Sequence, residues 1–537
     1  MSESTYRPVA LPLIALCLLV SVVARAETLA LTDASIADIN RAMDQGRITS
    51  EELVQRFLHR IESYDDAGPA INAVLQVNPD ALAEARELDA ERRRSGPRSP
   101  LHGIPVALKD NIDTADLPTT AGSFMLAGAV PPDDAFLVQR LRAAGAVIIA
   151  KLNMSEFASG GPLSSMDGQI YNPHDTSRSP AGSSGGTGAA IAAAYAMVGF
   201  GTDTGGSVRM PSSANGIVGL KPTLGLVSRD GIVPLALSFD TAGPMARNVY
   251  DVAATLGVVA GVDEADEATA GSAEHAYKTY TQFLDAQSLQ GARLGIARDF
   301  MGADGEVDWV MEAAFQAMRD AGAELVDVSL PQWLLDARGE FYRTVRYREF
   351  RAQIAEYLQT TGPDYPKTLR ALIEAAMALP SPDRAQGYTP NPSRWQLMLK
   401  EDEGGELTDR EYLAVRDHAL PLLRGVIEGI MDENALDAIV YPTQPQRPGR
   451  IDPDPTPGSA PGSGGSPVTL ANLTGFPDLI VPAGFTARGL PVTVSFFGRP
   501  FSEPQLLGLG YAFEQGTRAR RLPKLTPPLA GEILELE

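Results

Sequence analysis

The chain has 537 residues, of which 45 are Lys or Arg and 67 are Asp or Glu, so its formal net charge is −22. Hydrophobic residues make up 44% and charged residues 21%, as in a globular protein rather than a disordered one. Such acidity disfavours binding to nucleic acid or to anionic lipid, because both depend on clustered Lys and Arg. The single cysteine, Cys17, excludes an intramolecular disulfide, a cysteine-based zinc site and a CxxC redox site.

The first 26 residues have the pattern of a secretory signal peptide. Residues 8–24 carry no charge, Arg7 precedes them, and Ala24–Ala26 (Ala-Arg-Ala) forms an A-x-A cleavage site. The alternative is an uncleaved anchor, but the apolar run is at or below the lower limit of a bilayer span. We therefore expect residues 1–26 to be removed, leaving a periplasmic or secreted chain (27–537) with no stable membrane anchor and no cysteine.

Helices and strands alternate along this mature chain. Capping residues and apolar positions at helical spacing predict helices over 35–43, from Ser50 onward, and over 80–94, 136–143 and 503–515. Short apolar runs predict buried strands at 104–108, 146–150, 479–481 and 492–495. The alternation implies an α/β architecture in which helices cover a largely buried sheet.

Three further segments have a distinct composition. Residues 179–213 are rich in Gly and Ser, and within them 189–198 is apolar on every side, which predicts a helix buried all round. Residues 263–411 are more polar, and we expect a variable helical region that decorates the sheet. Residues 447–467 are dense in Pro, Gly and Ser and predict a mobile loop.

Two motifs rich in glycine and one lysine stand out as candidates for chemistry. Lys109 directly follows the predicted strand that ends at residue 108. Ser183 and Ser184 lie in Gly-Ser-Ser-Gly-Gly, and Ser207 lies in Gly-Thr-Asp-Thr-Gly-Gly-Ser-Val-Arg. Each feature alone is weak, because a lysine at a strand end is usually on the surface or paired, and a serine between glycines usually marks a turn.

Together these motifs resemble the amidase signature family, most closely its exported peptide amidase-type members. The family's G-T-D-x-G-G-S-[apolar]-R-x-P run is complete at 201–211, and Ser183 and Ser207 are 24 positions apart, as in the family. Its G-[apolar]-P-x-x-x-K-D-N motif is present at 103–111. The one departure in the core motif is Ala181, where many members have Gly. The resemblance covers nearly all of the mature chain and implies the amidase signature fold, a mixed sheet with helices on both faces.

The resemblance also implies a catalytic relay of Lys109, Ser183 and Ser207. Ser207 attacks the carbonyl of an amide, Ser183 passes its proton toward Lys109, and the peptide bond before Ser183 is cis. A serine hydroxyl needs such a base, and the five histidines are too scattered in the sequence to assemble a Ser-His-Asp arrangement. A lysine can serve if burial lowers its pKa from about 10.4 toward neutrality.

The residues around Ser207 have distinct expected roles. The turn Thr204, Gly205 and Gly206 is poor in side chains, as required where backbone N–H groups converge on an oxyanion. We expect Asp203 and Arg209 to be a structural ion pair that holds this loop. Ser184 would orient Ser183 or Ser207. No metal or cofactor is implied.

The sequence leaves alternatives to an amidase that cleaves small-molecule or peptide amides, with the C-terminal amide of peptides as the leading substrate. The run at 182–186 also matches the nucleophile elbow of α/β-hydrolases, but the residues before it do not form the hydrophobic strand that an elbow follows. An amidotransferase subunit that acts on aminoacyl-tRNA shares the signature, but the net charge and the signal peptide speak against a nucleic-acid partner. A binding protein on an inactive amidase scaffold is disfavoured by the presence of all three relay residues.

Overall fold

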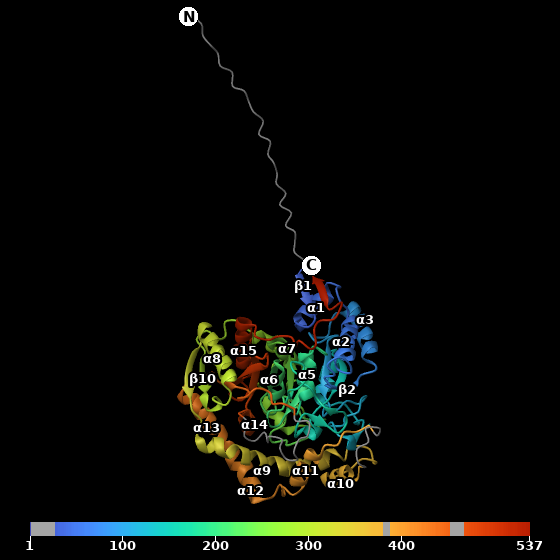
Figure 1. Ribbon diagram of the computed structural model, residues 1–537, viewed down its shortest axis with the longest axis vertical. Helices are drawn as coiled ribbons and strands as arrows, with labels where there is room; N and C mark the ends of the chain where they lie inside the picture. Colours follow the sequence, from blue (N-terminus) through green and yellow to red (C-terminus); the bar gives the residue numbers. More distant parts are fainter. Residues whose placement is uncertain (2–26, 380–386, 452–466, 537) are drawn as a thin grey trace.

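The computed structural model describes residues 1, 27–379, 387–451 and 467–536 (Figure 1). The predicted signal peptide therefore lies outside the described residues, as does most of the predicted loop at 447–467. The first and last described strands, β1 (Glu27–Ala30) and β15 (Ile533–Leu536), pair in antiparallel fashion, so residues 27–30 and 533–536 lie side by side.

One mixed sheet of 11 strands runs through the molecule. In spatial order its strands are β11 (Glu324–Val328), β10 (Arg293–Ala297), β12 (Ala438–Pro442), β14 (Pro491–Phe497), β13 (Asp478–Phe485), β8 (Val218–Lys221), β9 (Thr241–Ala246), β7 (Val198–Asp203), β3 (Pro105–Lys109), β4 (Val147–Leu152) and β2 (Val74–Val77). Strand β3 is parallel to β4 and β7, whereas β9 is antiparallel to β7 and β8. Every residue of these five strands is buried, so helices must cover both faces of the sheet. The predicted α/β architecture is confirmed.

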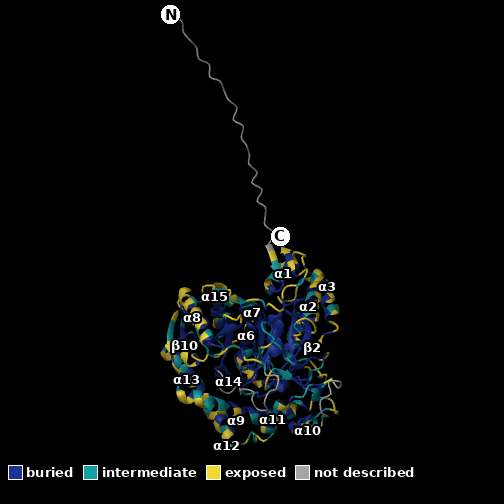
Figure 2. Cartoon of the chain, viewed as in Figure 1, coloured by how far each residue is buried: buried dark blue, intermediate teal, exposed yellow. Residues whose placement is uncertain are grey.

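The helices form groups that pack on the sheet and on one another. Their bounds are α1 (Ile36–Asp44), α2 (Ser50–Tyr64), α3 (Ala81–Ser95), α4 (Phe136–Ala143), α5 (Gly185–Ala192), α6 (Arg209–Asn215), α7 (Val249–Val259), α8 (Gly305–Asp320), α9 (Gln332–Tyr357), α10 (Leu369–Ala378), α11 (Pro392–Asp402), α12 (Arg410–Ala414), α13 (Leu420–Glu433), α14 (Thr469–Thr474) and α15 (Glu503–Thr517). Helices α4, α7, α15 and α8 contact one another in succession across the sheet, while α5 and α6 form a second group. The most deeply buried part of the chain surrounds α5 and α6 (Figure 2).

The prediction of a helix over 189–198 is wrong in its boundaries. Helix α5 begins earlier, at Gly185, and ends at Ala192, and the apolar run continues into strand β7 from Val198. Ala194 between them has φ +58°, a left-handed conformation that cannot continue a helix. A buried helix and a buried strand both have apolar residues on every side, so composition alone did not separate them.

Residues 263–411, expected to form a variable helical region, contain both helices and strands. Helices α8 to α11 lie there, but so do β10 and β11, which extend the sheet rather than decorate it. Helix α9 and its neighbours α11 and α12 lie along the lower edge of the molecule in Figure 1. In the described part of the chain, no helix combines the length and the apolar character needed to cross a membrane.

The described start of the Pro/Gly/Ser-rich segment is ordered against the chain that leads to Ser183. The Ser179 N–H donates to the Gly449 carbonyl at 2.8 Å, and the Ile451 N–H donates to the Ser177 carbonyl at 3.0 Å. These bonds place residues 449–451 beside residues 177–179, a few residues upstream of the candidate relay.

Candidate active site

The sheet brings Lys109 and Thr202 together. Lys109 is the last residue of β3 and is fully buried, and Thr202 lies near the end of the neighbouring parallel strand β7. Lys109 Nζ lies 2.7 Å from Thr202 Oγ1 and 3.4 Å from the Thr202 carbonyl oxygen. It also lies 2.7 Å from Ser183 Oγ, in the turn that precedes α5. The two residues that the resemblance assigns to the base end of the relay are therefore in direct contact.

Burial lowers the pKa of Lys109 to about 7. The amine has no solvent around it, and loss of hydration disfavours the charged form. Asp203 and Asp240 act in the opposite direction, because their negative charges favour the ammonium ion. The result is a lysine that can be a neutral amine, and so a base, close to neutral pH.

Asn111 shares the Thr202 hydroxyl with Lys109. Asn111 Nδ2 donates to Thr202 Oγ1 at 3.0 Å, so this hydroxyl oxygen receives one bond from Asn111 and one from Lys109. A hydroxyl oxygen has two lone pairs, and both are then occupied. If the two N–H bonds of a neutral Lys109 are directed at the two Thr202 oxygens, the nitrogen lone pair faces Ser183 Oγ.

The turn at Ser183 is held by residues that follow β4. The Gly182–Ser183 peptide bond is cis, as the resemblance implies. The Ser155 N–H donates to the Ser183 carbonyl at 3.0 Å. A Cβ atom on Gly182 would lie 2.5 Å from Ser155 Oγ, so a larger residue here would require the Ser155 hydroxyl to move.

Ser184 connects Ser183 to Ser207. The Ser184 N–H donates to the Ser207 carbonyl at 3.2 Å. Ser184 Oγ donates to the Thr202 carbonyl at 3.2 Å and accepts from the Thr202 N–H at 3.3 Å. The Ser184 hydroxyl is fully buried and bonded to β7, whereas an α/β-hydrolase elbow presents its serine hydroxyl to the substrate. The geometry disfavours the elbow alternative.

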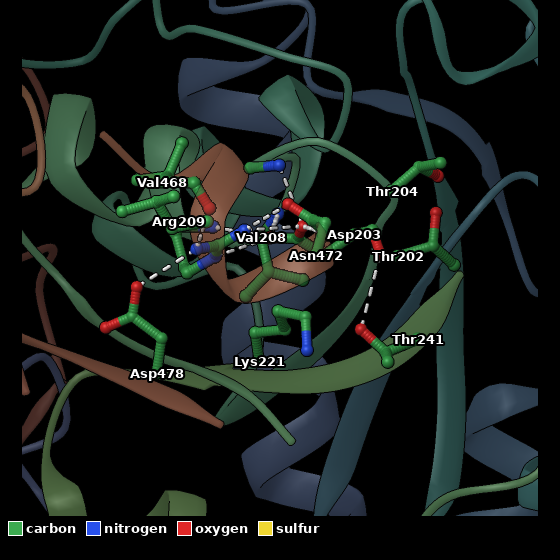
Figure 3. A network of polar contacts seen from close by, with 12 residues as sticks. Thr202, Asp203, Thr204, Val208, Arg209, Lys221, Thr241, Val468, Asn472 and Asp478 are labelled. Atoms are coloured by element: carbon green, nitrogen blue, oxygen red, sulfur yellow. Dashed lines mark hydrogen bonds and ion pairs between the residues drawn. The ribbon is translucent and has the colours of Figure 1, made fainter. Parts of the chain in front are cut away.

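Asp203 and Arg209 form the predicted ion pair, and both side chains are completely buried (Figure 3). Arg209 Nη2 and Nε lie 3.0 Å from the two Asp203 oxygens. The same carboxylate accepts the Gly206 and Val208 N–H groups at 2.8 and 2.9 Å. Burial alone would raise the pKa of Asp203, but the Arg209 guanidinium outweighs it and holds that pKa far below the usual range.

Arg209 carries this anchor into the rest of the fold. Its Nη1 contacts Asp478 on β13 at 3.0 Å and donates to the Val468 carbonyl at 2.5 Å, and its Nη2 donates to Asn472 Oδ1 at 2.6 Å (Figure 3). The loop before Ser207 is therefore tied to β13 and α14, which are more than 250 residues away in the sequence.

The loop Thr204–Ser207 lies between this anchor and a second acid. Thr204 Oγ1 donates to the buried Asp240, whose pKa burial raises to about 6. Gly206 has φ +114°, and a Cβ there would overlap the Val468 side chain, so the turn requires glycine. The Gly206 N–H is already bonded to Asp203, which speaks against it as an oxyanion donor. Ser207 is 8% exposed and lies just before the start of α6.

The sequence motifs pointed to Lys109 and the serines as candidate site residues. They did not point to two side chains that contact this site, Thr202 beside Lys109 and Asp240 beside Thr204. Thr202 stands inside the motif at 201–211, yet nothing in the sequence showed that its hydroxyl would meet a lysine from another strand. Asp240 lies 36 positions from its partner Thr204, and no spacing rule points to it. Among the described residues, no group of three or more His, Cys, Asp or Glu side chains is placed to hold a metal ion.

The amidase family model matches residues 52–507. The chain belongs to the amidase family. The solved structure of the native peptide amidase from Stenotrophomonas maltophilia has a TM-score of 0.83 and 41% sequence identity, over 92% of this chain and 99% of that one. This amidase has the amidase signature fold and is a hydrolase of C–N amide bonds.

Two relatives of different named function are similar to this chain over most of its length. A probable amidase of Arabidopsis thaliana is 33% identical over 93% of this chain and 92% of its own length. A relative from Chloroflexus aggregans, named as one subunit of a glutamyl-tRNA(Gln) amidotransferase, is 38% identical over 90% of this chain and 96% of its own length. Sequence identity to these relatives therefore does not distinguish an amidase from an amidotransferase subunit.

The Thr202 hydroxyl gives a prediction that the motif alone did not. Thr202→Val keeps the shape of the side chain but removes an acceptor for the Lys109 N–H and the Asn111 amide. We expect kcat/KM to fall at least about tenfold, and the acidic limb of its pH profile to move to lower pH, because the ammonium form loses a partner. Thr202→Ser retains the hydroxyl and should restore both quantities. A Thr202→Val enzyme with the wild-type profile would contradict this role.

Proposed function

We propose that this amidase hydrolyses the C-terminal amide of peptides through an acyl-serine intermediate, with Ser207 as the nucleophile and Ser183 and Lys109 as its proton relay. The observation that carries the mechanism is the 2.7 Å contact between the buried Lys109 Nζ and Ser183 Oγ. Ser207 is the nucleophile because its backbone is bonded to Ser184, next to Ser183, and it ends the glycine turn.

The proposed reaction proceeds in two halves. Ser207 Oγ bonds to the amide carbonyl carbon while its proton passes to Ser183, and the Ser183 proton passes to the neutral Lys109. The tetrahedral intermediate then expels the amine, which gains a proton returned along the same relay, and the acyl group stays on Ser207. Water then attacks the ester carbonyl and gives a proton to the relay, the relay returns a proton to Ser207 Oγ as the ester C–O bond breaks, and the carboxylic acid is released.

The oxyanion of each tetrahedral intermediate would be stabilised by the backbone N–H groups of Thr204 and Gly205. Donors aimed at the developing charge are usually the largest single contribution to such catalysis. Gly206 supplies the sharp turn rather than a donor, since its N–H is held by Asp203.

The peptide-amide substrate is supported by the likeness to the Stenotrophomonas maltophilia peptide amidase at 41% identity. The second candidate is an amidotransferase-type subunit that acts on aminoacyl-tRNA, supported by the relative that is 38% identical. The net charge of −22 weighs against the second candidate, because a tRNA partner is also negatively charged.

The substrate assignment predicts which bond is cut. A peptide amide, the same peptide as a free acid, and free glutamine should be incubated with enzyme and with the Ser207→Ala variant. We expect ammonia and the free-acid peptide from the first substrate only, and no product with the variant. Ammonia from glutamine with the peptide amide left intact would favour the amidotransferase alternative.

The nucleophile can be identified by covalent labelling. A fluorophosphonate should form an adduct on Ser207, located by peptide mapping, because the relay activates that hydroxyl. Ser207→Ala should abolish both labelling and amide hydrolysis. An adduct on Ser184 would overturn the assignment in favour of the α/β-hydrolase elbow, and the absence of any adduct would favour an inactive scaffold.

The pKa of Lys109 predicts the pH dependence. Only the neutral amine accepts the Ser183 proton, and burial lowers the Lys109 pKa to about 7. Activity should therefore be low on the acidic side, rise through about pH 7 and then level off. A pH profile of kcat/KM for a peptide amide measures this limb, and full activity at pH 5 would contradict it.

Lys109→Ala should harm amides more than esters. An amine leaves only after it gains a proton, so amide cleavage needs the relay in both directions, whereas an alkoxide leaves with much less help. The loss in kcat/KM should be larger for an amide than for the ester of the same acyl group, with about 1.4 kcal/mol for each tenfold difference. Equal losses would remove Lys109 from protonation of the leaving amine.

Export of the enzyme is the last part of the proposal. The Ala-Arg-Ala site at 24–26 predicts a mature N-terminus at Glu27, where strand β1 begins. N-terminal sequencing of the protein isolated from its own host, after cell fractionation, measures this directly. Intact Met1 in the cytosolic fraction would contradict both cleavage and a periplasmic or secreted location.

A further inference from the structure

Helix α9 presents a row of polar side chains to the core. Arg346, Glu349, Gln353 and Tyr357 follow one another at steps of three or four residues, so they share one face of the helix. Arg346 and Glu349 are only 3% and 1% exposed. Polar groups buried in this way destabilise a fold unless they are hydrogen-bonded. Their partners therefore show what this face of α9 holds.

The two ends of this row bind loops close to the relay. Arg346 Nη2 donates to Ser159 Oγ at 2.9 Å. The next residue, Gly160, has its carbonyl oxygen 3.8 Å from where a Cβ on Gly182 would stand, immediately before Ser183. At the other end, the Tyr357 hydroxyl donates to Asp113 at 2.8 Å, four residues after Lys109.

The middle of the row binds the turn Leu235–Asp240. Glu349 accepts the Ser238 N–H at 2.9 Å and the Ser238 hydroxyl at 2.5 Å. Gln353 Oε1 accepts the Leu237 N–H at 2.9 Å. Helix α9 thus supplies the acceptors for two consecutive backbone donors of a loop that is more than 100 residues away in the sequence.

The remaining backbone donors of this turn are bonded within it. Asp240 accepts the Leu235 and Ala236 N–H groups at 2.8 and 2.9 Å. The Phe239 and Asp240 N–H groups both donate to the Ala236 carbonyl at 2.8 Å. All six N–H groups from Leu235 to Asp240 therefore have a partner, and the two that the turn cannot satisfy itself are satisfied by Glu349 and Gln353.

Asp240 transmits the position of this turn to the active site. Its second carboxylate oxygen accepts the Thr204 hydroxyl, and Thr204 begins the turn that ends at Ser207. A displacement of the Leu235–Asp240 turn would move Asp240, and with it the backbone on which an oxyanion would bind. Misplacement by about 1 Å can cost two orders of magnitude in rate.

We propose that Glu349, assisted by Gln353, is a positioning residue for catalysis: by fixing the Leu235–Asp240 turn, it sets the place of Asp240 and Thr204 and so of the segment that leads to Ser207. Neither side chain touches the relay. The proposal rests on the proposed function, since it takes Ser207 as the nucleophile and the Thr204 region as the oxyanion site. A structural role alone would change stability without changing the rate per active site.

The test compares two isosteric changes on the same helix. Glu349→Gln removes the charge that binds Ser238, while Glu356→Gln makes the same chemical change at an exposed position and serves as the control. The concentration of active sites is titrated with a fluorophosphonate, and kcat and KM for a peptide amide are measured per titrated site. We expect kcat to fall about tenfold in Glu349→Gln with KM changed less than about twofold, and Ser207 labelling to slow in parallel. The control should match the wild type in every quantity.

A second variant keeps the test decisive if Glu349→Gln fails to fold. Gln353→Met removes only the acceptor of the Leu237 N–H from a half-buried position, and kcat per site should fall in the same way. When Thr204→Val is combined with either variant, the losses in kcat should be less than additive, because all three side chains position the same segment through Asp240. Unchanged kcat per site in the folded variants, or full additivity with Thr204→Val, would overturn the proposal. Failure to label Ser207 in the wild type would instead overturn the proposed function beneath it.

Discussion

The buried ion pair between Asp203 and Arg209 is the interaction on which the active site depends. Removing two full charges from water is costly, and only close contacts and further hydrogen bonds offset that cost. Here the Asp203 carboxylate also accepts the Gly206 and Val208 N–H groups, and Arg209 also binds Asp478 (Figure 3). Loss of one partner from such a pair typically destabilises a fold by about 3–5 kcal/mol. The pair thus couples the shape of the loop before Ser207 to the stability of the core.

The carboxylate of this pair also acts on Lys109. Lys109 is buried at the end of β3, close enough to Asp203 for that carboxylate to favour the ammonium ion. Arg209 carries the charge opposite to that of Asp203, and loss of hydration is the larger effect on the Lys109 pKa. The Lys109 pKa therefore falls although this carboxylate favours the ammonium ion.

Sequence analysis predicted those parts of the site that depend on local pattern. The motifs at 103–111, 182–186 and 201–211 supplied the candidate relay residues, and alternating helices and strands predicted the α/β fold. What it missed depends on contacts between distant segments: Asp240 on Thr204, and β10 and β11 as sheet strands rather than decoration. The wrong boundary of α5 has a different cause, since an apolar run specifies burial but not the period of the backbone.

The loop that ends at Ser207 is bonded to two buried acids, Asp203 and Asp240, whose pKa values are shifted in opposite directions. Asp203 is paired and keeps its charge at any ordinary pH, whereas burial raises the pKa of Asp240 to about 6. Burial brings the Lys109 pKa to about 7 and the Asp240 pKa to about 6, and above this region Asp240 is ionised. In that state the Thr204 hydroxyl donates to a full carboxylate, a bond roughly twice as strong as one to a neutral acceptor. Ionisation of Asp240 therefore strengthens the support of the loop that ends at Ser207, and α9 holds the turn from which that support comes.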